Sequence, residues 1–270
     1  MSINLDKERF YYNPDFLGSD QGRSVRILSE YYGPLQRFQQ NKILDTIVFF
    51  GSARTLSKDD AQNALDNAPK NVDKQTMKRL KSDLKMSIYY EDARILSSKF
   101  TTWSKELKGT KRRYIICSGG GPGIMEASNR GAAEAGGINV GLTISLPHEA
   151  SGNEWITNDL DMKFHYFFMR KFWFLYLAKA LIVWPGGFGT LDELMECLTL
   201  IQTQKIKKRL PIVLYGKEFW ENVVNWDYLV DVGTISKEDL NLFHISDDIN
   251  DTYQYVTNFI EKYQLKGPNF

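Results

Sequence analysis

The stretch that decides the fold reads Leu181-Ile-Val-Trp-Pro-Gly-Gly-Phe-Gly-Thr-Leu-Asp-Glu-Leu194. Four apolar residues at its start predict a short buried strand, the glycines after Pro185 predict a turn, and Thr190 is predicted to open an amphipathic helix. Glycine lets the backbone approach a ligand closely, and the first turn of a helix offers unpaired N–H groups at the positive end of its dipole. This turn therefore predicts a phosphate-binding site.

A purely structural interpretation of the same residues is also open. Thr190 and Glu193 have the spacing of a capping box, in which the Glu193 side chain satisfies a backbone N–H group at its own helix start. Taken alone, the stretch fits a structural strand-to-helix joint as well as it fits a phosphate site. Other parts of the chain have to distinguish the structural joint from the phosphate site.

Composition restricts the classes of function. The chain has 270 residues, of which 43% are hydrophobic, enough for one large domain or a domain with an appendage. Its 34 Lys and Arg nearly balance its 33 Asp and Glu, and the net charge of +1 argues against nucleic acid as a partner. The first ten residues lack the apolar core of a signal peptide, and no apolar run reaches the ~18 residues that would span a membrane. We therefore expect a cytoplasmic protein with no membrane partner.

Cysteine and histidine are scarce, with two and three residues respectively. Cys117 and Cys197 fall in a predicted strand and a predicted helix, where free buried thiols are expected rather than a disulfide. No His or Cys cluster has the spacing of metal ligands. The sequence therefore predicts no metal site.

Two more loops follow predicted strands. The strand at 43–50 leads into Gly51-Ser52-Ala53-Arg54, and the strand at 114–117 leads into Ser118-Gly119-Gly120-Gly121-Pro122-Gly123. Pro122 is predicted as the first residue of a helix, which makes a second helix start suited to an anion. The glycine spacing matches neither the Rossmann dinucleotide fingerprint nor a P-loop.

The rest of the chain alternates between strand and helix patterns. Residues 1–40 are predicted to form an N-terminal covering arm with one short helix that ends before a turn at Gly33-Pro34, and 41–270 a single domain. A charged insert at about 57–86 is predicted as a solvated helix or a long loop. The remaining predicted helices are 87–108, 122–135, 168–178, 219–230 and 253–263, and the remaining strands are 138–146, 161–167 and 209–216.

Arg170 is an anomaly in the apolar helix predicted at 168–178. An arginine in the first turn of a buried helix meets the positive end of the dipole and loses its hydration, so it needs an anionic partner. A structural carboxylate, a catalytic carboxylate and a ligand phosphate all meet that need. In the loop at 147–159, His148, Glu149 and Asn153 are candidate ligand contacts, although a plain surface position is expected for each.

The alternation predicts an α/β fold of the Rossmann-like, doubly wound type, with a mostly parallel sheet and helices on both faces. In such a sheet the strand-to-helix turns meet at the carboxyl edge, where ligands bind. The loop at 51–54, the glycine run at 119–123, Arg170 and the turn at 186–193 all fall at that edge. Their convergence favours a ligand site.

Three of these motifs, in this order, resemble the LONELY GUY (LOG) family, whose members are often labelled lysine decarboxylases. They are the glycine run with its Pro-Gly-x-Met, Met169-Arg170-Lys171, and Pro185-Gly-Gly-Phe-Gly-Thr-Leu-Asp-Glu193. The resemblance covers about residues 43–215. It implies a phosphoribohydrolase that cleaves the N-glycosidic bond of a nucleoside 5′-monophosphate, such as AMP or a cytokinin riboside monophosphate, to free base and ribose 5-phosphate. It also implies a homodimer or higher homo-oligomer and no cofactor.

Carried over by position, the resemblance makes Arg170 and Glu193 the catalytic pair. The residues implied in substrate and phosphate binding are Gly51, Ser52, Gly120, Gly121, Lys171, Gly186, Gly187, Gly189 and Thr190. A carboxylate suits this chemistry because breaking the ribosyl C–N bond passes through an oxocarbenium-like state. At a helix N-terminus, Glu193 is expected to stay ionised and to stabilise this state or activate water.

Two other functions remain as alternatives. The same turns would hold a nucleotide in a non-catalytic binding or sensing module. A decarboxylase would need a pyridoxal phosphate Schiff-base lysine, and no lysine has a persuasive context for one. The preferred base, and the choice between cytokinin activation and general purine nucleotide turnover, stay open.

Overall fold

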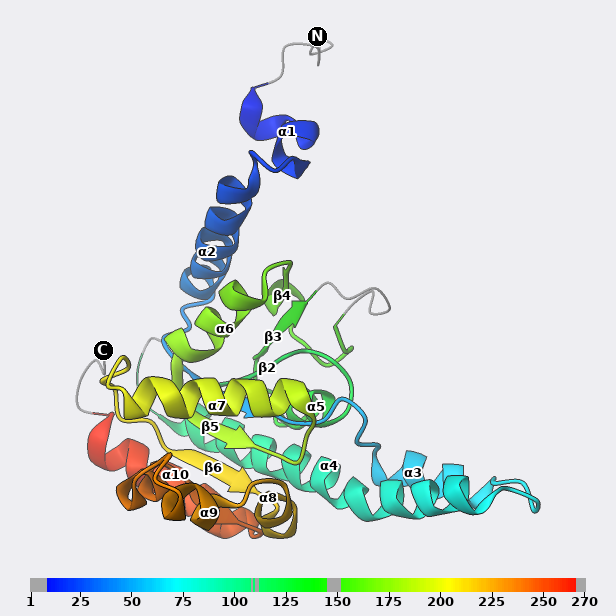
Figure 1. The fold of residues 1–270 in the computed structure, drawn as a ribbon. Helices are drawn as coiled ribbons and strands as arrows, with labels where there is room; N and C mark the ends of the chain where they lie inside the picture. Colours follow the sequence, from blue (N-terminus) through cyan, green and yellow to red (C-terminus); the bar gives the residue numbers. More distant parts are fainter. Residues whose placement is uncertain (1–8, 108, 110–111, 145–151, 266–270) are drawn as a thin grey trace.

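The computed structural model describes residues 9–107, 109, 112–144 and 152–265. In this part of the chain, seven parallel strands form one sheet in the order β4-β3-β2-β1-β5-β6-β7, with helices on both faces (Figure 1). The predicted Rossmann-like, doubly wound α/β fold is confirmed. The strands are β1 (Thr46–Phe50), β2 (Ile115–Ser118), β3 (Asn139–Ile144), β4 (Asp161–Phe164), β5 (Ala178–Val183), β6 (Ile212–Tyr215) and β7 (His244–Ser246).

The helices connect successive strands or extend from the sheet. They are α1 (Pro14–Gly18), α2 (Arg23–Gln40), α3 (Lys58–Asp66), α4 (Lys74–Glu106), α5 (Ile124–Glu134), α6 (Phe167–Tyr176), α7 (Phe188–Gln202), α8 (Lys217–Val223), α9 (Trp226–Asp231) and α10 (Ile249–Tyr263). Short 3₁₀ helices lie at Phe10–Tyr12, Asn158–Leu160 and Lys237–Leu242. No helix in the described ranges combines the length and the apolarity needed to cross a membrane.

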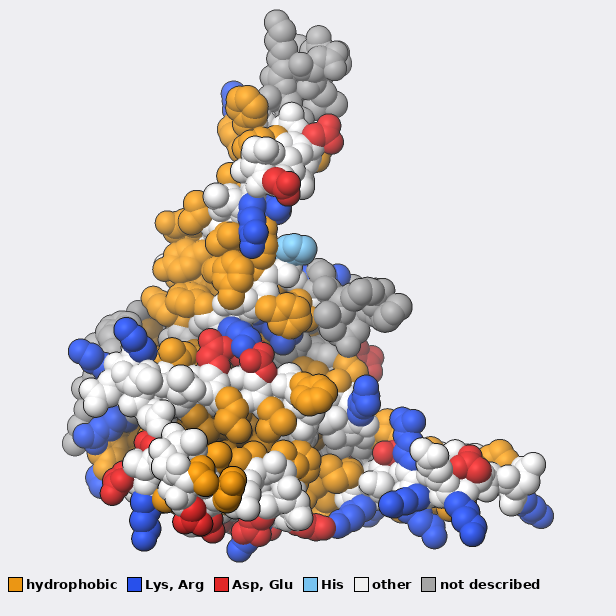
Figure 2. Space-filling view, viewed as in Figure 1, with side chains coloured by type: hydrophobic (Ala, Val, Ile, Leu, Met, Phe, Trp, Pro, Cys, Tyr) orange, Lys and Arg blue, Asp and Glu red, His pale blue; other side chains and the backbone are white. Residues whose placement is uncertain are grey.

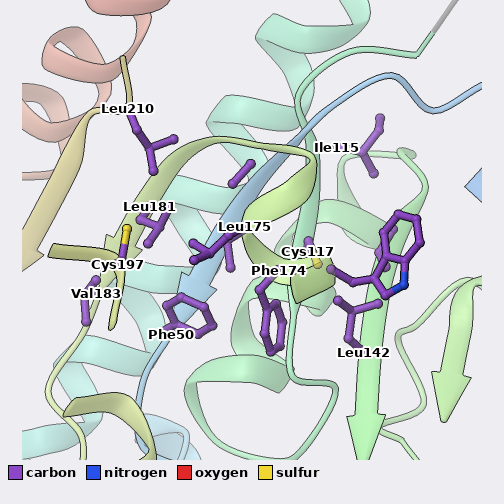
Figure 3. Close-up of a cluster of buried hydrophobic side chains, with 14 of the residues drawn as sticks. Phe50, Ile115, Cys117, Leu142, Phe174, Leu175, Leu181, Val183, Cys197 and Leu210 are labelled. Carbon is purple, nitrogen blue, oxygen red and sulfur yellow. The ribbon is translucent and has the colours of Figure 1, made fainter. Parts of the chain in front are cut away.

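Alternate residues of the central strand supply two separate cores. Val48 and Phe50 face the core under α2, α6 and α7, whereas Ile47 and Phe49 face the core under α4, α5 and α10. Every residue of β1 is buried, as expected for a strand covered on both faces. Figure 3 shows part of the first core, where Phe174 of α6 and Cys197 of α7 lie against side chains of the strands. Both cysteines are free and buried, as predicted.

The chain reverses its direction of sheet growth at β1. Strands β2, β3 and β4 add on one side of β1, and β5, β6 and β7 add on the other. A crevice is expected at the carboxyl ends of the two strands that flank such a switch point. These are β1, which ends before Gly51, and β5, which ends before the Pro185 turn.

Several predicted boundaries were wrong. The charged insert is helical, which is one of the two structures predicted for it, since it contains α3, capped by the side chain of Ser57, and the first part of α4. The boundary was wrong because α4 begins at Lys74, capped by Asp73, well before the predicted start at residue 87. With α3 alongside it, the first part of α4 extends beyond the sheet (Figure 1). The helix predicted at 219–230 is two helices, α8 and α9, and strand β7 was missed because three residues carry too little pattern.

The turn predicted at Gly33-Pro34 is also wrong, because α2 continues through it to Gln40. Proline inside a helix leaves the carbonyl four residues earlier without its N–H partner. Here that carbonyl belongs to Glu30, and the indole Nε1–H of Trp173 donates to it at 2.9 Å. Tertiary contact with α6 therefore replaces the helical hydrogen bond that Pro34 removes.

We expect Trp173→Phe to destabilise the fold more than the same change at Trp184. Both tryptophans are fully buried, but the Trp184 indole N–H has no hydrogen-bond partner among the described residues. The Trp173 change leaves the Glu30 carbonyl unsatisfied, which costs roughly 1–2 kcal/mol beyond the lost packing. Chemical denaturation measures both variants, and equal losses of stability would contradict the role assigned to this hydrogen bond.

Candidate active site

The loops after β1, β2 and β5 are joined to one another at the switch point. The backbone N–H of Ser52 donates to the carbonyl of Pro185 at 3.0 Å, and the N–H of Ile124 donates to the carbonyl of Ser52 at 3.0 Å. Gly123 has a φ of 69°, and a Cβ there would lie 2.3 Å from the Ser52 carbonyl oxygen. Only glycine fits this close crossing. Three predicted motifs therefore lie next to one another at the switch point: Gly51-Ser52, the glycine run and the Pro185 turn.

Arg170 and Glu193 meet beside these loops. Arg170 lies in the first turn of α6, and its Nη2 is 4.0 Å from Oε1 of Glu193 in the first half of α7. A Cβ built on Gly119 would lie 3.9 Å from Nη1 of Arg170, so the guanidinium also reaches the glycine run. The rings of Phe167 and Phe174 lie 5.6 and 5.3 Å from the guanidinium carbon. The anionic partner expected for Arg170 includes the carboxylate of Glu193.

Burial controls the charge of Glu193. The residue is 6% exposed, and loss of hydration raises the pKa of its carboxyl to about 7, although Arg170 and Lys171 oppose the rise. This differs from the expectation that Glu193 stays fully ionised, because desolvation outweighs the neighbouring positive charges. Near neutral pH the residue is therefore present in both protonation states, which suits proton transfer.

Helix α7 begins without a side-chain cap. Its N-cap is Gly187, so the helix starts at Phe188, two residues before the predicted start at Thr190. The capping-box interpretation of Glu193 is wrong, because no side chain within the described residues caps this helix. The N–H groups of its first turn remain for a ligand. Thr190 is instead packed on the turn, since a Cβ on Gly186 would lie 2.1 Å from its Oγ1.

The exposed part of this turn consists of Gly187, Phe188 and Gly189. No atom lies within 4 Å of a Cβ built on either glycine, and the Phe188 side chain is 94% exposed. The turn thus leaves open space beside the Cα atoms of both glycines. That space and the positive end of the helix dipole suit a phosphate group.

The glycine run after β2 is held from behind by Asn153. The Asn153 side-chain amide donates to the carbonyls of Gly120 and Gly121 at 3.1 Å each, and its backbone N–H donates to Gly120 at 2.8 Å. The structure thus gives Asn153 a role in positioning the run. His148 and Glu149, the other candidates in this loop, lie outside the described residues.

Asn129 is a positioning residue that the sequence analysis missed. It is fully buried in α5, and its side-chain oxygen accepts from Ser118 Oγ at 2.7 Å and from Asn153 at 3.0 Å. Its amide donates to Asn139 Oδ1 at 2.9 Å. The network ties α5, β2, β3 and the loop before β4 to the glycine run. The sequence feature that could have predicted this role is an asparagine among the small, closely packed residues of the helix.

Lys171 forms ion pairs with two carboxylates of α7. Its ammonium lies 2.7 Å from Asp192 Oδ2 and 2.8 Å from Glu196 Oε2, both on α7. These ion pairs join α6 to α7 next to the Arg170 and Glu193 pair. The described residues contain no group of three His, Cys, Asp or Glu placed to hold a metal ion.

One family model and one distant relative match parts of the chain. The family model "Possible lysine decarboxylase" matches residues 125–256, which include Arg170, Glu193 and the turn between them. The chain is 31% identical over 117 residues to the "Pyrimidine/purine nucleotide 5′-monophosphate nucleosidase" of Escherichia coli strain K12, a match that covers 39% of this chain. The matched segment is 25% of the length of that relative.

Two solved structures of the molybdenum cofactor carrier protein from Chlamydomonas reinhardtii also match. They are 15% and 16% identical and cover 80% and 81% of this chain and 98% and 99% of the carrier chains, with TM-scores of 0.41 and 0.43. At this distance the match says nothing about activity. The matched family model includes Met169-Arg170-Lys171 and the Pro185 turn, and it supports the resemblance of this chain to the LONELY GUY family.

Proposed function

We propose that the protein hydrolyses the N-glycosidic bond of a nucleoside 5′-monophosphate to free base and ribose 5-phosphate. The observation that carries the proposal is the pair of half-buried Arg170 and buried Glu193, 4.0 Å apart, next to the uncapped start of α7. Support also comes from the name of the Escherichia coli relative, which describes a nucleotide 5′-monophosphate nucleosidase.

The N-terminus of α7 binds the 5′-phosphate. The first-turn N–H groups behind Gly187 and Gly189 donate to the phosphate oxygens, and the helix dipole favours their charge. Fixing the phosphate fixes the ribose, which places the anomeric carbon over the carboxylate of Glu193. This division of roles makes the phosphate a requirement for rapid hydrolysis.

Glu193 acts on water. In its ionised form it takes a proton from a water molecule that forms the new bond to the anomeric carbon, while the bond to the base breaks. The bonding electron pair leaves with the base, which gains a proton, so the two hydrogens of water end on the sugar hydroxyl and on the base. Arg170 orients the carboxylate and stabilises the charge that develops during the step.

The substrate class is tested by chromatography of AMP, GMP, CMP, IMP and isopentenyl-AMP after incubation with the protein, with the matching nucleosides as controls. We expect free base from at least one nucleotide and at least 100-fold slower release from its nucleoside. Intact nucleotide that remains bound to the protein in every reaction would instead support a binding or sensing module. Equal rates for nucleotide and nucleoside would contradict the phosphate site.

The rate is expected to depend on pH through Glu193. Because the base must be ionised and its pKa lies at about 7, kcat/KM should rise about tenfold per pH unit below pH 7 and level off above it. Steady-state rates between pH 5 and pH 9 check this. Lys171→Met removes a positive charge that holds this pKa down, so it should move the rising limb to higher pH. A value of kcat/KM that falls as pH rises through 7 would indicate that Glu193 acts as an acid, and it would contradict the proposed role.

A further inference from the structure

A cavity of about 860 Å³ begins at the amino edge of the sheet, opposite the glycine turns, and runs along α6. The residues that lead into β1 and β5 line its beginning, and α6, the C-terminal half of α7 and the segment at 205–208 line the rest. None of the described lining residues belongs to the three glycine turns. Small-molecule sites in proteins occupy about 300–1,000 Å³. The cavity is therefore large enough for a ligand of its own.

The long wall of the cavity is apolar. Phe168, Phe172 and Tyr176, at every fourth position of α6, line it over two helical turns, or about 12 Å. Leu200 of α7 and Ile206 also line it. Figure 2 shows hydrophobic side chains over α6 and a group of Lys and Arg side chains at the C-terminal end of α7. This shape and lining suit an elongated apolar group with a charged end.

The end of the cavity at the amino edge carries an excess of positive charge. Asp45 is fully buried there, and its carboxylate accepts from Arg113 Nε and from the backbone N–H of Tyr114, each at 2.6 Å. Lys179 and Lys208 line the same end, and the charge of Asp45 acts on both of them. One carboxylate is thus shared by three cationic side chains. Because charges removed from water need compensation, this end favours an anion.

Lys208 is fixed at this end with one N–H group left to donate. Its ammonium donates to the carbonyls of Leu175 and Tyr176 at the end of α6, the second at 3.2 Å. Since an ammonium has three N–H donors, the third remains for a ligand. Burial, together with the charge of Lys179, lowers the pKa of Lys208 to about 8. An anion bound beside Lys208 would supply the compensation that this charge lacks.

We propose that the cavity binds a straight-chain carboxylate of the fatty-acid type, with its carboxylate beside Lys208 and its apolar chain along α6 toward Phe168. The opposite end of the cavity does not compete for the carboxylate, because Lys171 there already pairs with Asp192 and Glu196 at 2.7 and 2.8 Å. The chain replaces water against the apolar wall, and the carboxylate accepts the third N–H of Lys208. The inference does not depend on the proposed hydrolysis.

Calorimetric titration of the full chain with decanoate tests the site. Decanoate should bind in a saturable way, and shorter carboxylates should bind more weakly, by about fourfold for each methylene group removed. Decylammonium has the same chain with the opposite charge, and it should bind weaker than decanoate by about tenfold or more. If decanoate does not saturate a site, or if decylammonium binds as tightly as decanoate, the proposal is wrong.

Two variants place the ligand within the cavity. Lys208→Met removes the charge and should weaken decanoate binding by about tenfold or more, whereas Lys237→Met, a matched change at an exposed lysine outside the cavity, should leave it unchanged. Because Lys208 also holds the end of α6, Leu200→Trp is the second variant, which fills part of the cavity and keeps every charge. It should weaken decanoate binding by a similar factor. Unchanged decanoate affinity in either folded variant would overturn the proposal.

Discussion

A Glu193→Gln variant should lose nucleotide hydrolysis by about three orders of magnitude and still bind nucleotide. The amide has the same shape, but it cannot take a proton from water, and the phosphate site proposed at the start of α7 does not use this side chain. Product formation and calorimetric binding of AMP measure the two effects separately. A variant that keeps more than a tenth of the activity would show that Glu193 is not the base.

The same substitution should stabilise the protein at alkaline pH. The folded pKa of Glu193, about 7, lies above the ordinary value of 4.5, so the folded state holds this proton more tightly than the unfolded state does. Stability is therefore lost as pH rises between these two values. Each pH unit between them is worth about 1.4 kcal/mol, and the ionised, buried carboxylate costs about 3 kcal/mol at pH 8.

Thermal unfolding at pH 4 and pH 8 checks the sign of this effect. Glu193→Gln should raise the melting temperature by several degrees at pH 8 and change it little at pH 4. Glu196→Gln is the matched control on the same helix, because its side chain is 35% exposed and already paired with Lys171. A stability gain of the same size in both variants, or a larger gain at pH 4, would contradict the account of Glu193.

Asn129→Ala should destabilise the protein by about 3 kcal/mol and raise KM for the nucleotide. The change leaves buried groups of Ser118 and Asn139 and the half-buried amide of Asn153 without their partner. Asn153 holds the carbonyls of Gly120 and Gly121, so loosening it should disturb the glycine run beside the proposed catalytic pair. Urea unfolding measures the stability, and initial rates at several nucleotide concentrations give KM.

Asn63→Ala is the control for the asparagine prediction. Asn63 is also helical, but it is exposed on α3, far along the chain from the site. Alanine favours a helix more than asparagine does, so this variant should be neutral or slightly more stable. If the two variants behave alike, or if Asn129→Ala changes stability without changing KM, the network does not position the glycine run.

Much of the fold was predictable because its signals are local. Buried parallel strands such as β1 and β5 are continuous apolar runs, and glycine turns end them. The alternation of strands and helices therefore predicts the parallel sheet and the edge at which ligands bind in such sheets. One error occurred where a distant contact determines the structure. The sequence near Gly33-Pro34 predicts a turn, and only Trp173, some 140 residues later, supplies the hydrogen bond that lets α2 continue.

The features of the candidate site can also be separated into those that the local sequence predicts and those that contacts between distant residues determine. Its pair of Arg170 and Glu193 could be predicted from motif order, because both follow strand ends that meet at one edge. The protonation of Glu193 could not, since desolvation depends on how closely α6 and α7 cover the carboxyl. Asn129 was missed for a related reason. A polar residue in a helix shows its role only when its burial and its partners in other elements are known.

The most direct test is the stoichiometry of products from AMP, measured with the unmodified protein and with Glu193→Gln. The proposed reaction predicts adenine and ribose 5-phosphate in equal amounts from the unmodified protein and about a thousandfold less of each from the variant. Adenosine with inorganic phosphate, or adenine released equally well by the variant, would contradict the central claim that Glu193 activates water against the glycosidic bond.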